Sequence, residues 1–273
     1  MRLKISFIVI SVISLLTMSF TLNNDKPGKK FSGKYDIGGY KLFLSSMGRK
    51  KPAVILESGF GEGGTRSGWE IVQKKVSKFA KVCLYDRAGL GLSDEGPGPR
   101  TTIQIAEELH ALLRVSHIEP PYILVGHSMG GLHIQTYAML YPGEIAAMVF
   151  VDPSPEEIID TLATDVFENL VSAGASGAVM DETGPGLNAS IPVFKSLPGL
   201  PDVPVVVITS AYNGENETDK ERWEELKACH QKLSDGVTDG RHVVASRSGH
   251  YIQINEPELV IDAIKSVCDK VRK

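Results

Sequence analysis

A short apolar segment at residues 122–125 runs directly into the sequence Gly126-His127-Ser128-Met129-Gly130. Apolar residues then return at helical spacing over residues 132–140. A strand that turns sharply into a helix around Gly-x-Ser-x-Gly holds the central residue in a strained backbone conformation and exposes its hydroxyl above the sheet edge. The flanking glycines avoid Cβ clashes across the turn. We therefore take Ser128 as the candidate nucleophile.

Apolar strands alternate with helical patterns along the rest of the chain. Strands are predicted at residues 53–56, 81–85, 147–151, 203–208 and 243–245, and helices at 67–79, 101–115 and from about 256 to the end. Two runs at residues 35–37 and 40–44 flank Gly38-Gly39 and indicate an antiparallel hairpin. Strands that are apolar throughout favour an α/β fold, a mostly parallel sheet with helices on both faces.

The segment 153–202 interrupts this alternation. A helical pattern at residues 156–171 is followed by a stretch rich in Gly, Ala, Ser and Pro at residues 172–201. Long connections inside a compact domain are usually functional, and this one leaves the sheet at the edge where α/β sheets bind ligands. We expect it to form a small lid.

Composition and the lack of certain motifs argue against binding of nucleic acids, metals and nucleotide cofactors. The net charge is −4 with no long basic run, which argues against nucleic acid as a partner. The chain has no CxxC, HExxH or Walker-type motif, so we expect no metal and no nucleotide cofactor. Cys229 and Cys268 fall on different predicted helices, and whether they pair is open.

The N-terminus resembles a targeting segment. Arg2 and Lys4 precede an apolar stretch at residues 5–22, and a polar, Lys-rich segment follows to residue 30. This order is typical of a secretory signal, although no sharp cleavage site stands out, so an uncleaved membrane anchor is the alternative. We therefore expect a leader or anchor over residues 1–30, a domain over 31–273, and a secreted or extracytoplasmic location. The oligomeric state is left open.

A serine nucleophile needs a base, and the base needs a group that orients it. Of the seven histidines, His250 follows the last predicted strand and precedes the terminal helix, which places it at the same sheet edge as Ser128. Asp152 ends a predicted strand and is the preferred acid, because a strand end holds a side chain more rigidly than a polar loop. Glu215 is the competing acid. His127 is expected to line the floor of the site.

Acyl transfer also needs two backbone N–H groups directed at the developing oxyanion. One is expected from Met129, the residue after the nucleophile. The other is expected from Phe60, because Gly59 and Gly61 let the backbone of this loop approach the site.

Four motifs together resemble the α/β-hydrolase superfamily: Ser58-Gly59-Phe60-Gly61, the segment Asp86-Arg87-Ala88-Gly89-Leu90-Gly91-Leu92-Ser93, Gly126-His127-Ser128-Met129-Gly130-Gly131, and Gly249-His250. The resemblance covers residues 31–273 and implies an eight-stranded sheet, a lid after the sixth strand and no cofactor. Ser58 replaces the usual histidine of the oxyanion loop. Residues 211–213 carry no carboxylate where the acid usually lies, which supports Asp152.

The serine at position 128 distinguishes the chain from the haloalkane dehalogenase and epoxide hydrolase branches, which resemble this fold but use aspartate there. The expected function is hydrolysis of a carboxylic ester or related acyl bond of a small molecule, as in the lid-bearing, esterase-like branch. An acyltransferase or a small-peptide peptidase is the alternative within the same chemistry. A ligand-binding receptor with a hydrolase fold is the alternative outside catalysis.

Overall fold

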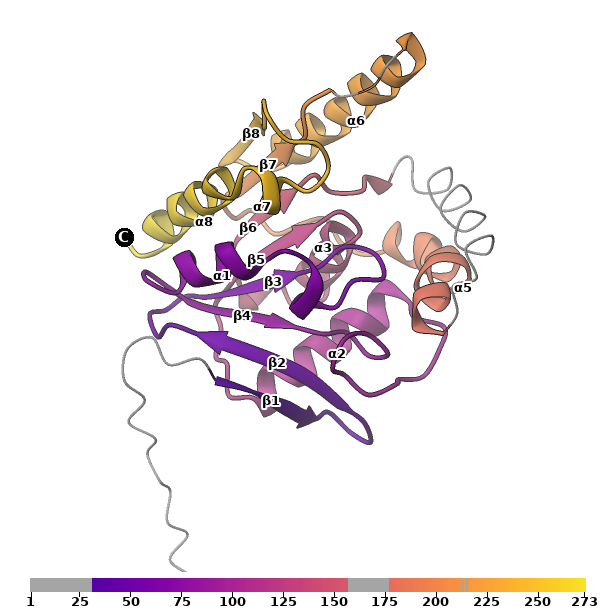
Figure 1. Cartoon of the computed structure of the whole chain (residues 1–273), viewed down its shortest axis with the longest axis vertical. Helices are drawn as coiled ribbons and strands as arrows, with labels where there is room; N and C mark the ends of the chain where they lie inside the picture. Colours follow the sequence, from indigo (N-terminus) through magenta and orange to yellow (C-terminus); the bar gives the residue numbers. More distant parts are fainter. Residues whose placement is uncertain (1–30, 157–176, 213, 215) are drawn as a thin grey trace, which may run out of the picture.

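The computed structural model describes residues 31–156, 177–212, 214 and 216–273. At its centre is an eight-stranded sheet in the order β1-β2-β4-β3-β5-β6-β7-β8 (Figure 1). The pairs β1–β2 and β2–β4 are antiparallel, and all other pairs are parallel. The predicted eight-stranded, mostly parallel sheet is thereby confirmed. The strands are β1 (Phe31–Asp36), β2 (Lys41–Met47), β3 (Ala53–Glu57), β4 (Lys81–Tyr85), β5 (Tyr122–His127), β6 (Ile145–Val151), β7 (Val205–Thr209) and β8 (Gly240–Val244).

Helices cover both faces of this sheet. On one face lie α1 (Glu70–Val76), α7 (Ile252–Asn255) and α8 (Pro257–Val271), which contact one another (Figure 1). On the other lie α2 (Thr102–Val115) and α3 (Gly130–Leu140), which also pack together, and α6 (Glu217–Asp235), which packs on β7 and β8. Two short 3-10 helices, η1 (Gly64–Arg66) and η2 (Pro142–Glu144), lie in the connections.

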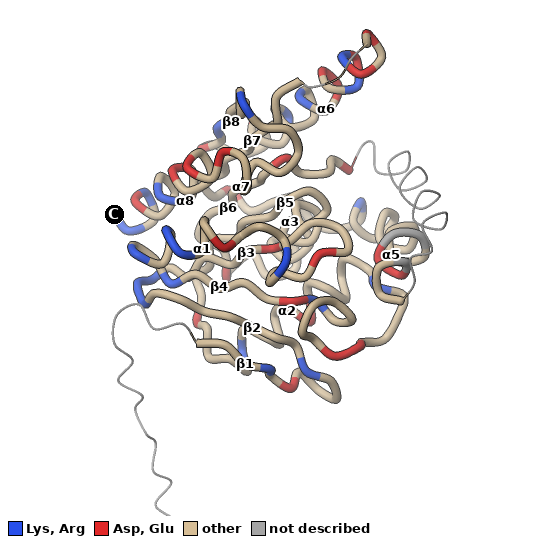
Figure 2. The backbone as a smooth tube through the Cα atoms, viewed as in Figure 1, with Lys and Arg blue, Asp and Glu red and all other residues tan. Residues whose placement is uncertain are grey.

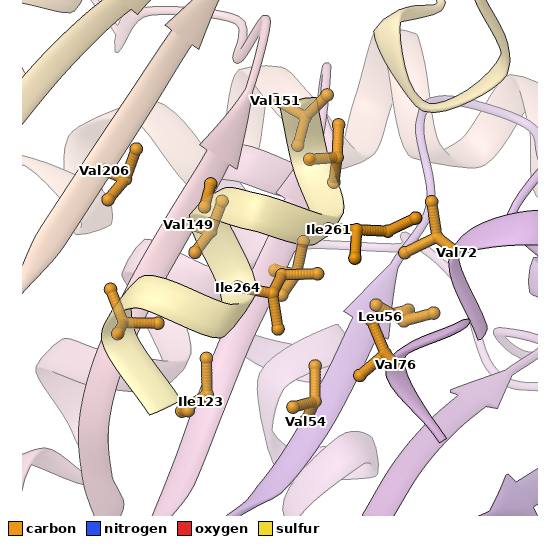
Figure 3. Close-up of a cluster of buried hydrophobic side chains, with 14 of the residues drawn as sticks. Val54, Leu56, Val72, Val76, Ile123, Val149, Val151, Val206, Ile261 and Ile264 are labelled. Carbon is orange, nitrogen blue, oxygen red and sulfur yellow. The ribbon is translucent and has the colours of Figure 1, made fainter. Parts of the chain in front are cut away.

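Alternate residues of the central strands supply the two hydrophobic cores. Val54 and Leu56 of β3 belong to the core under α1 and α8, where Ile261 and Ile264 of α8 lie over the strands (Figure 3). Their neighbours along the strand face the core under α2 and α3. Each fully buried side chain of this type contributes about 1.5–3 kcal/mol through loss of apolar surface from water. A strand buried on both faces therefore needs an uninterrupted apolar sequence.

Local signals set most helix ends. The Thr101 side chain accepts a hydrogen bond from the Gln104 N–H and caps α2, and Pro257 occupies the first turn of α8. The helix predicted at residues 67–79 is shorter, since α1 begins at Glu70; Gly68 has a φ of +75° and breaks the helical path. Strand β8 begins at Gly240, ahead of the predicted start at 243, because an edge strand does not require apolar residues throughout.

The segment 153–202 differs from the sequence prediction. The helix predicted at residues 156–171 lies almost wholly outside the described residues. The following stretch, predicted as a Gly- and Pro-rich loop, contains helix α5 (Ala178–Phe194), with Pro185 and Pro192 inside it. One face of α5 is buried, so tertiary packing outweighs the poor helix propensity. The buried residues of this face are Ala178, Glu182, Leu187, Ser190 and Phe194.

Charged residues lie mainly outside the sheet. Both signs alternate along α6 and α8, whereas β5 and β6 contain no Lys, Arg, Asp or Glu (Figure 2).

No disulfide joins Cys229 of α6 to Cys268 of α8 in the described part of the chain. Among the described residues, no helix is both long and apolar enough to cross a bilayer. The predicted leader or anchor, residues 1–30, lies outside them.

Candidate active site

Ser128 occupies the sharp turn between β5 and α3. Its φ of +54° is a conformation that a residue with a Cβ rarely adopts. The turn is held in place because the Ser128 N–H donates to the Val151 carbonyl (3.2 Å) and its carbonyl accepts from Gly131 N–H (2.8 Å) and Ser154 N–H (3.0 Å). The Ser128 hydroxyl makes no hydrogen bond within the described residues. The predicted strand–turn–helix corner is present, and its serine side chain is not used to stabilise the fold.

Glycines allow this turn to pack closely. A Cβ on Gly126 would lie 2.5 Å from the Gly130 carbonyl oxygen, and a Cβ on Gly130 would lie 2.6 Å from the Ser58 carbonyl oxygen. Either contact is shorter than real Cβ atoms tolerate. Glycine at 126 lets the end of β5 lie against the start of α3, and glycine at 130 lets the end of β3 approach the same helix.

Asp152 and His250 meet beside this turn. Asp152 directly follows β6 with a φ of +46°, and its Oδ2 lies 2.7 Å from His250 Nδ1. The other carboxylate oxygen accepts the Ser210 N–H at 2.7 Å. Burial opposes ionisation, but the hydrogen bond and charge of His250, with the Ser210 N–H, hold the pKa of Asp152 below its ordinary value. The ionised carboxylate therefore accepts the Nδ1 proton, so that Nε2 is the acceptor whenever the ring carries a single proton.

The His127 side chain contacts the loop that carries His250. It is 1% exposed, its Nε2 lies 3.0 Å from the His250 carbonyl oxygen, and the two rings are 4.6 Å apart. Burial, followed by the charge of His250, lowers the pKa of His127 to about 3. A neutral His127 donates from Nε2 to that carbonyl and fixes the backbone of His250.

The loop of residues 58–61 packs directly on the nucleophile turn. A Cβ on Gly59 would lie 3.3 Å from the Ser128 Cβ and 3.0 Å from His127 Nδ1. Within the described residues, the backbone N–H groups of Phe60 and Met129 donate to no protein acceptor. Two N–H groups beside Ser128 are thus available to a ligand.

Comparison with known proteins agrees with this architecture. Residues 52–175 match the family model described as "alpha/beta hydrolase fold". The chain has the α/β-hydrolase fold.

Individual relatives are distant or are matched over part of their length. The chain is 26% identical to the protein YqjL of Bacillus subtilis (strain 168), over 78% of this chain and 82% of that one. It is 37% identical to the efuK protein of Hormonema carpetanum over 45% of this chain but only 19% of that protein's length. Among solved structures, a thermophilic esterase from Thermogutta terrifontis aligns over 90% of this chain and 100% of its own, with a TM-score of 0.62 and 20% identity. That similarity concerns the fold.

Sequence reasoning missed a buried ion-pair network in this α/β-hydrolase fold. Arg87, the second residue of the Asp86–Ser93 motif, pairs with Glu57 at the end of β3 (2.7 Å) and with Glu182 of α5 (2.8 Å). Burial opposes ionisation of both carboxyls. The pKa of Glu57 is nevertheless held below its ordinary value by the His133 hydrogen bond and by Arg87, and that of Glu182 by Arg87 first and His133 after it. An arginine two residues after a largely apolar strand was the available signal, since buried arginines are almost always paired.

The remainder of that motif stabilises the loops. Asp86 accepts hydrogen bonds from Thr65 N–H (2.9 Å) and Leu92 N–H (2.7 Å), and the Ser93 hydroxyl accepts from Phe43 N–H (2.8 Å). These contacts connect the loop of residues 86–93 to η1 and to β2. Asp86 and Ser93 therefore stabilise the scaffold.

An apolar cluster includes Met129, the residue after Ser128. Its members come from the 58–61 loop, from Met129 and α3, and from α5: Phe60, Met129, Leu132, Met139, Leu187, Ile191 and Phe194. Phe60 and Met129, the predicted oxyanion residues, therefore belong to a largely buried apolar cluster that joins α5 to the central fold.

The competing acid, Glu215, lies outside the described residues. The segment after β7 reaches the site through backbone instead, because Ser210 N–H binds Asp152 and Ala211 N–H donates to the Ser248 carbonyl at 2.8 Å. Among the described residues, no group of three or more His, Cys, Asp and Glu side chains is arranged to hold a metal ion.

Proposed function

We propose that this protein cleaves a carboxylic ester or a related acyl bond through an acyl-enzyme on Ser128. The observation that carries the proposal is the 2.7 Å contact between His250 Nδ1 and Asp152 Oδ2 at the edge of the sheet where the strained serine turn projects. A base that is oriented by a buried carboxylate, beside a serine whose hydroxyl serves no structural bond, is the arrangement that nucleophilic catalysis needs.

In the first half of the reaction, Ser128 Oγ attacks the acyl carbonyl carbon and its proton moves to His250 Nε2. Asp152 keeps Nδ1 protonated and stabilises the imidazolium that forms. The carbonyl oxygen becomes an oxyanion, and the N–H groups of Phe60 and Met129 donate to it. When the tetrahedral intermediate collapses, the bond to the leaving alcohol breaks and His250 Nε2 returns the proton to that oxygen.

In the second half, a water molecule takes the place of the alcohol. His250 Nε2 removes one proton from the water as its oxygen attacks the acyl carbon, and the same two N–H groups stabilise the second oxyanion. Collapse releases the carboxylic acid, and the proton returns to Ser128 Oγ. The enzyme is regenerated without any change of oxidation state.

The apolar cluster formed by the 58–61 loop, α3 and α5 supports an apolar acyl group as the preferred substrate. Burying apolar surface contributes about 25 cal/mol per Å², so each methylene that reaches this cluster lowers the barrier if it is buried in the transition state. A series of linear acyl chains should therefore show rising kcat/KM until the cluster is filled.

Hydrolysis of p-nitrophenyl esters of increasing acyl length by the purified protein tests the proposal, with Ser128→Ala as the control. We expect at least one ester to be hydrolysed by the wild type and none by the variant, while circular dichroism shows both folded. A fluorophosphonate should label the wild type at Ser128 alone. If no ester is hydrolysed but a small ligand raises the melting temperature, the receptor alternative replaces the enzyme.

A further inference from the structure

The guanidinium group of Arg87 is fully hydrogen-bonded within the protein. Its side chain is 2% exposed, and its five N–H groups match five hydrogen bonds. Nε donates to Glu182 Oε1 (2.8 Å) and one terminal nitrogen to Glu182 Oε2 (2.8 Å) and the Gly59 carbonyl (2.8 Å). The other terminal nitrogen donates to Glu57 Oε1 (2.7 Å) and the Ser58 carbonyl (3.0 Å).

The bond to the Gly59 carbonyl acts on the proposed oxyanion donor. The Gly59 carbonyl and the Phe60 N–H belong to one planar trans peptide group, in which C=O and N–H point in opposite directions. Holding the Gly59 oxygen toward Arg87 therefore directs the Phe60 N–H away from Arg87. On the other side of Phe60, the Gly61 N–H lies 3.4 Å from Glu182 Oε2. The Arg87–Glu182 ion pair therefore contacts the backbone on both sides of Phe60.

Glu182 is the component that comes from outside the central sheet. It lies on α5, whereas Arg87 and Glu57 follow β4 and end β3. Glu182 accepts the Nε hydrogen and one terminal hydrogen of Arg87. Without its carboxylate these two donors would be buried with no partner, and Arg87 would have to shift to satisfy them.

We propose that Glu182 is a positioning residue: by fixing Arg87, it aims the Phe60 N–H at the oxyanion, so that the docking of α5 completes the oxyanion hole. The inference rests on the proposed function of the Ser128 site. Glu182 touches neither the substrate nor the reacting atoms. It acts through Arg87 and the peptide group that joins Gly59 and Phe60.

A second buried ion pair supplies the matched control. Arg100 and Glu108 have side chains that are 1% and 6% exposed and form two hydrogen bonds of 2.5 and 2.6 Å. Arg100 lies near α5, since a Cβ on Gly186 would meet its carbonyl oxygen at 2.3 Å. Neither residue hydrogen-bonds to the 58–61 loop. Loss of this pair should weaken the fold near α5 without turning the Phe60 peptide.

The test compares Glu182→Gln with Glu108→Gln in the full chain. Three quantities are measured: the melting temperature, kcat and KM for the best p-nitrophenyl ester, and the ratio of oxo-ester to thiono-ester hydrolysis. Sulfur fits an oxyanion hole poorly, so this ratio reports on the hole itself. Removing one whole oxyanion donor costs about 100- to 1,000-fold in kcat.

A misdirected donor should cost less, so Glu182→Gln should lower kcat by about 10- to 100-fold with KM within about twofold, and should reduce the oxo/thiono ratio. Glu108→Gln should lower the melting temperature while leaving kcat and the ratio unchanged. If Glu182→Gln does not fold, Glu182→Asp, which keeps the charge and withdraws it by one methylene, takes its place in the comparison.

The inference is overturned if the Glu182 variant keeps the wild-type kcat and ratio, or if Glu108→Gln changes both equally. Failure of the proposed function is a different result, because the wild type itself would then hydrolyse no ester.

Discussion

The carboxylate of Asp152 is held at both oxygens, with Oδ2 at 2.7 Å from His250 Nδ1 and Oδ1 at 2.7 Å from the Ser210 N–H. The side chain therefore cannot rotate without losing a buried hydrogen bond. The backbone directly after β7 orients the carboxylate, and the carboxylate orients the imidazole. This double contact makes the consequence of an amide at position 152 predictable.

Asp152→Asn should lower kcat by about three to four orders of magnitude while the protein stays folded. The Ser210 N–H needs an acceptor, so the amide oxygen should turn toward it and the amide NH2 toward His250. Nδ1 must then act as an acceptor, which places the ring proton on Nε2, where it cannot accept from Ser128. Steady-state kinetics with a p-nitrophenyl ester measure the loss.

Two further variants serve as controls for this prediction. Asp202 also accepts two hydrogen bonds, from Thr238, but lies at the other end of β7, so Asp202→Asn should keep kcat. Glu215→Gln should likewise change little. The assignment of Asp152 is wrong if the Glu215 variant is inactive and Asp152→Asn retains activity.

Gly130→Ala should destabilise the protein by about 1–3 kcal/mol and reduce activity, because overpacking forces backbone to move. The added Cβ would lie 2.6 Å from the Ser58 carbonyl oxygen and 2.8 Å from that of Glu57, and neither atom belongs to a flexible side chain. Urea denaturation measures the change. Gly143→Ala is the control, since its Cβ meets nothing within 4 Å and its effect should stay within about 1 kcal/mol. Equal stability of the two variants would contradict the close packing of β3 against α3.

The parts predicted from sequence depend on local patterns. Strands buried on both faces need continuous apolar runs, and the strained turn at Ser128 needs glycine on both sides, so both leave a short-range signature. The contact between Asp152 and His250 was expected because a strand end fixes a side chain with little help from elsewhere. The role of Asp152 as the acid stays a prediction.

The parts that were missed depend on contacts distant in sequence. Arg87 and Glu182 are 95 residues apart, and nothing near Glu182 marks it as a partner of a strand-end arginine. Helix α5 contains Pro185 and Pro192, so its local composition argues against a helix. Packing of one buried face and the ion pair to Arg87 stabilise it instead.

His127 should make stability depend on pH in the acid range. Its pKa is lowered from 6.5 to about 3 by burial and by His250, so between these values the unfolded chain binds a proton that the folded protein does not. The free energy of unfolding should therefore fall as the pH is lowered from 6.5 toward 3, by up to about 1.4 kcal/mol per pH unit from this residue.

His127→Gln removes this dependence while keeping a donor for the His250 carbonyl. The slope of the unfolding free energy against pH, measured by urea denaturation between pH 4 and 6.5, should be shallower in the variant than in the wild type. Identical slopes would mean that His127 is protonated in the folded protein, and its proposed donation from a neutral ring would then be wrong.

Ser128→Gly should stabilise the fold while abolishing hydrolysis. The φ of +54° at Ser128 strains any residue with a Cβ, at a cost of about 1–3 kcal/mol, whereas glycine adopts this conformation freely. Glycine also gives the unfolded chain more freedom, which offsets about 0.4–1 kcal/mol of the gain. The net increase should be roughly 1 kcal/mol, or about 2–4 °C in melting temperature for a domain of this size.

Ser128→Ala is the matched control, because it removes the hydroxyl but keeps the Cβ and the strain. Thermal denaturation should place the alanine variant near the wild type and the glycine variant above both. If the two variants melt at the same temperature, the turn stores no strain, and the serine is exposed by its neighbours' packing alone.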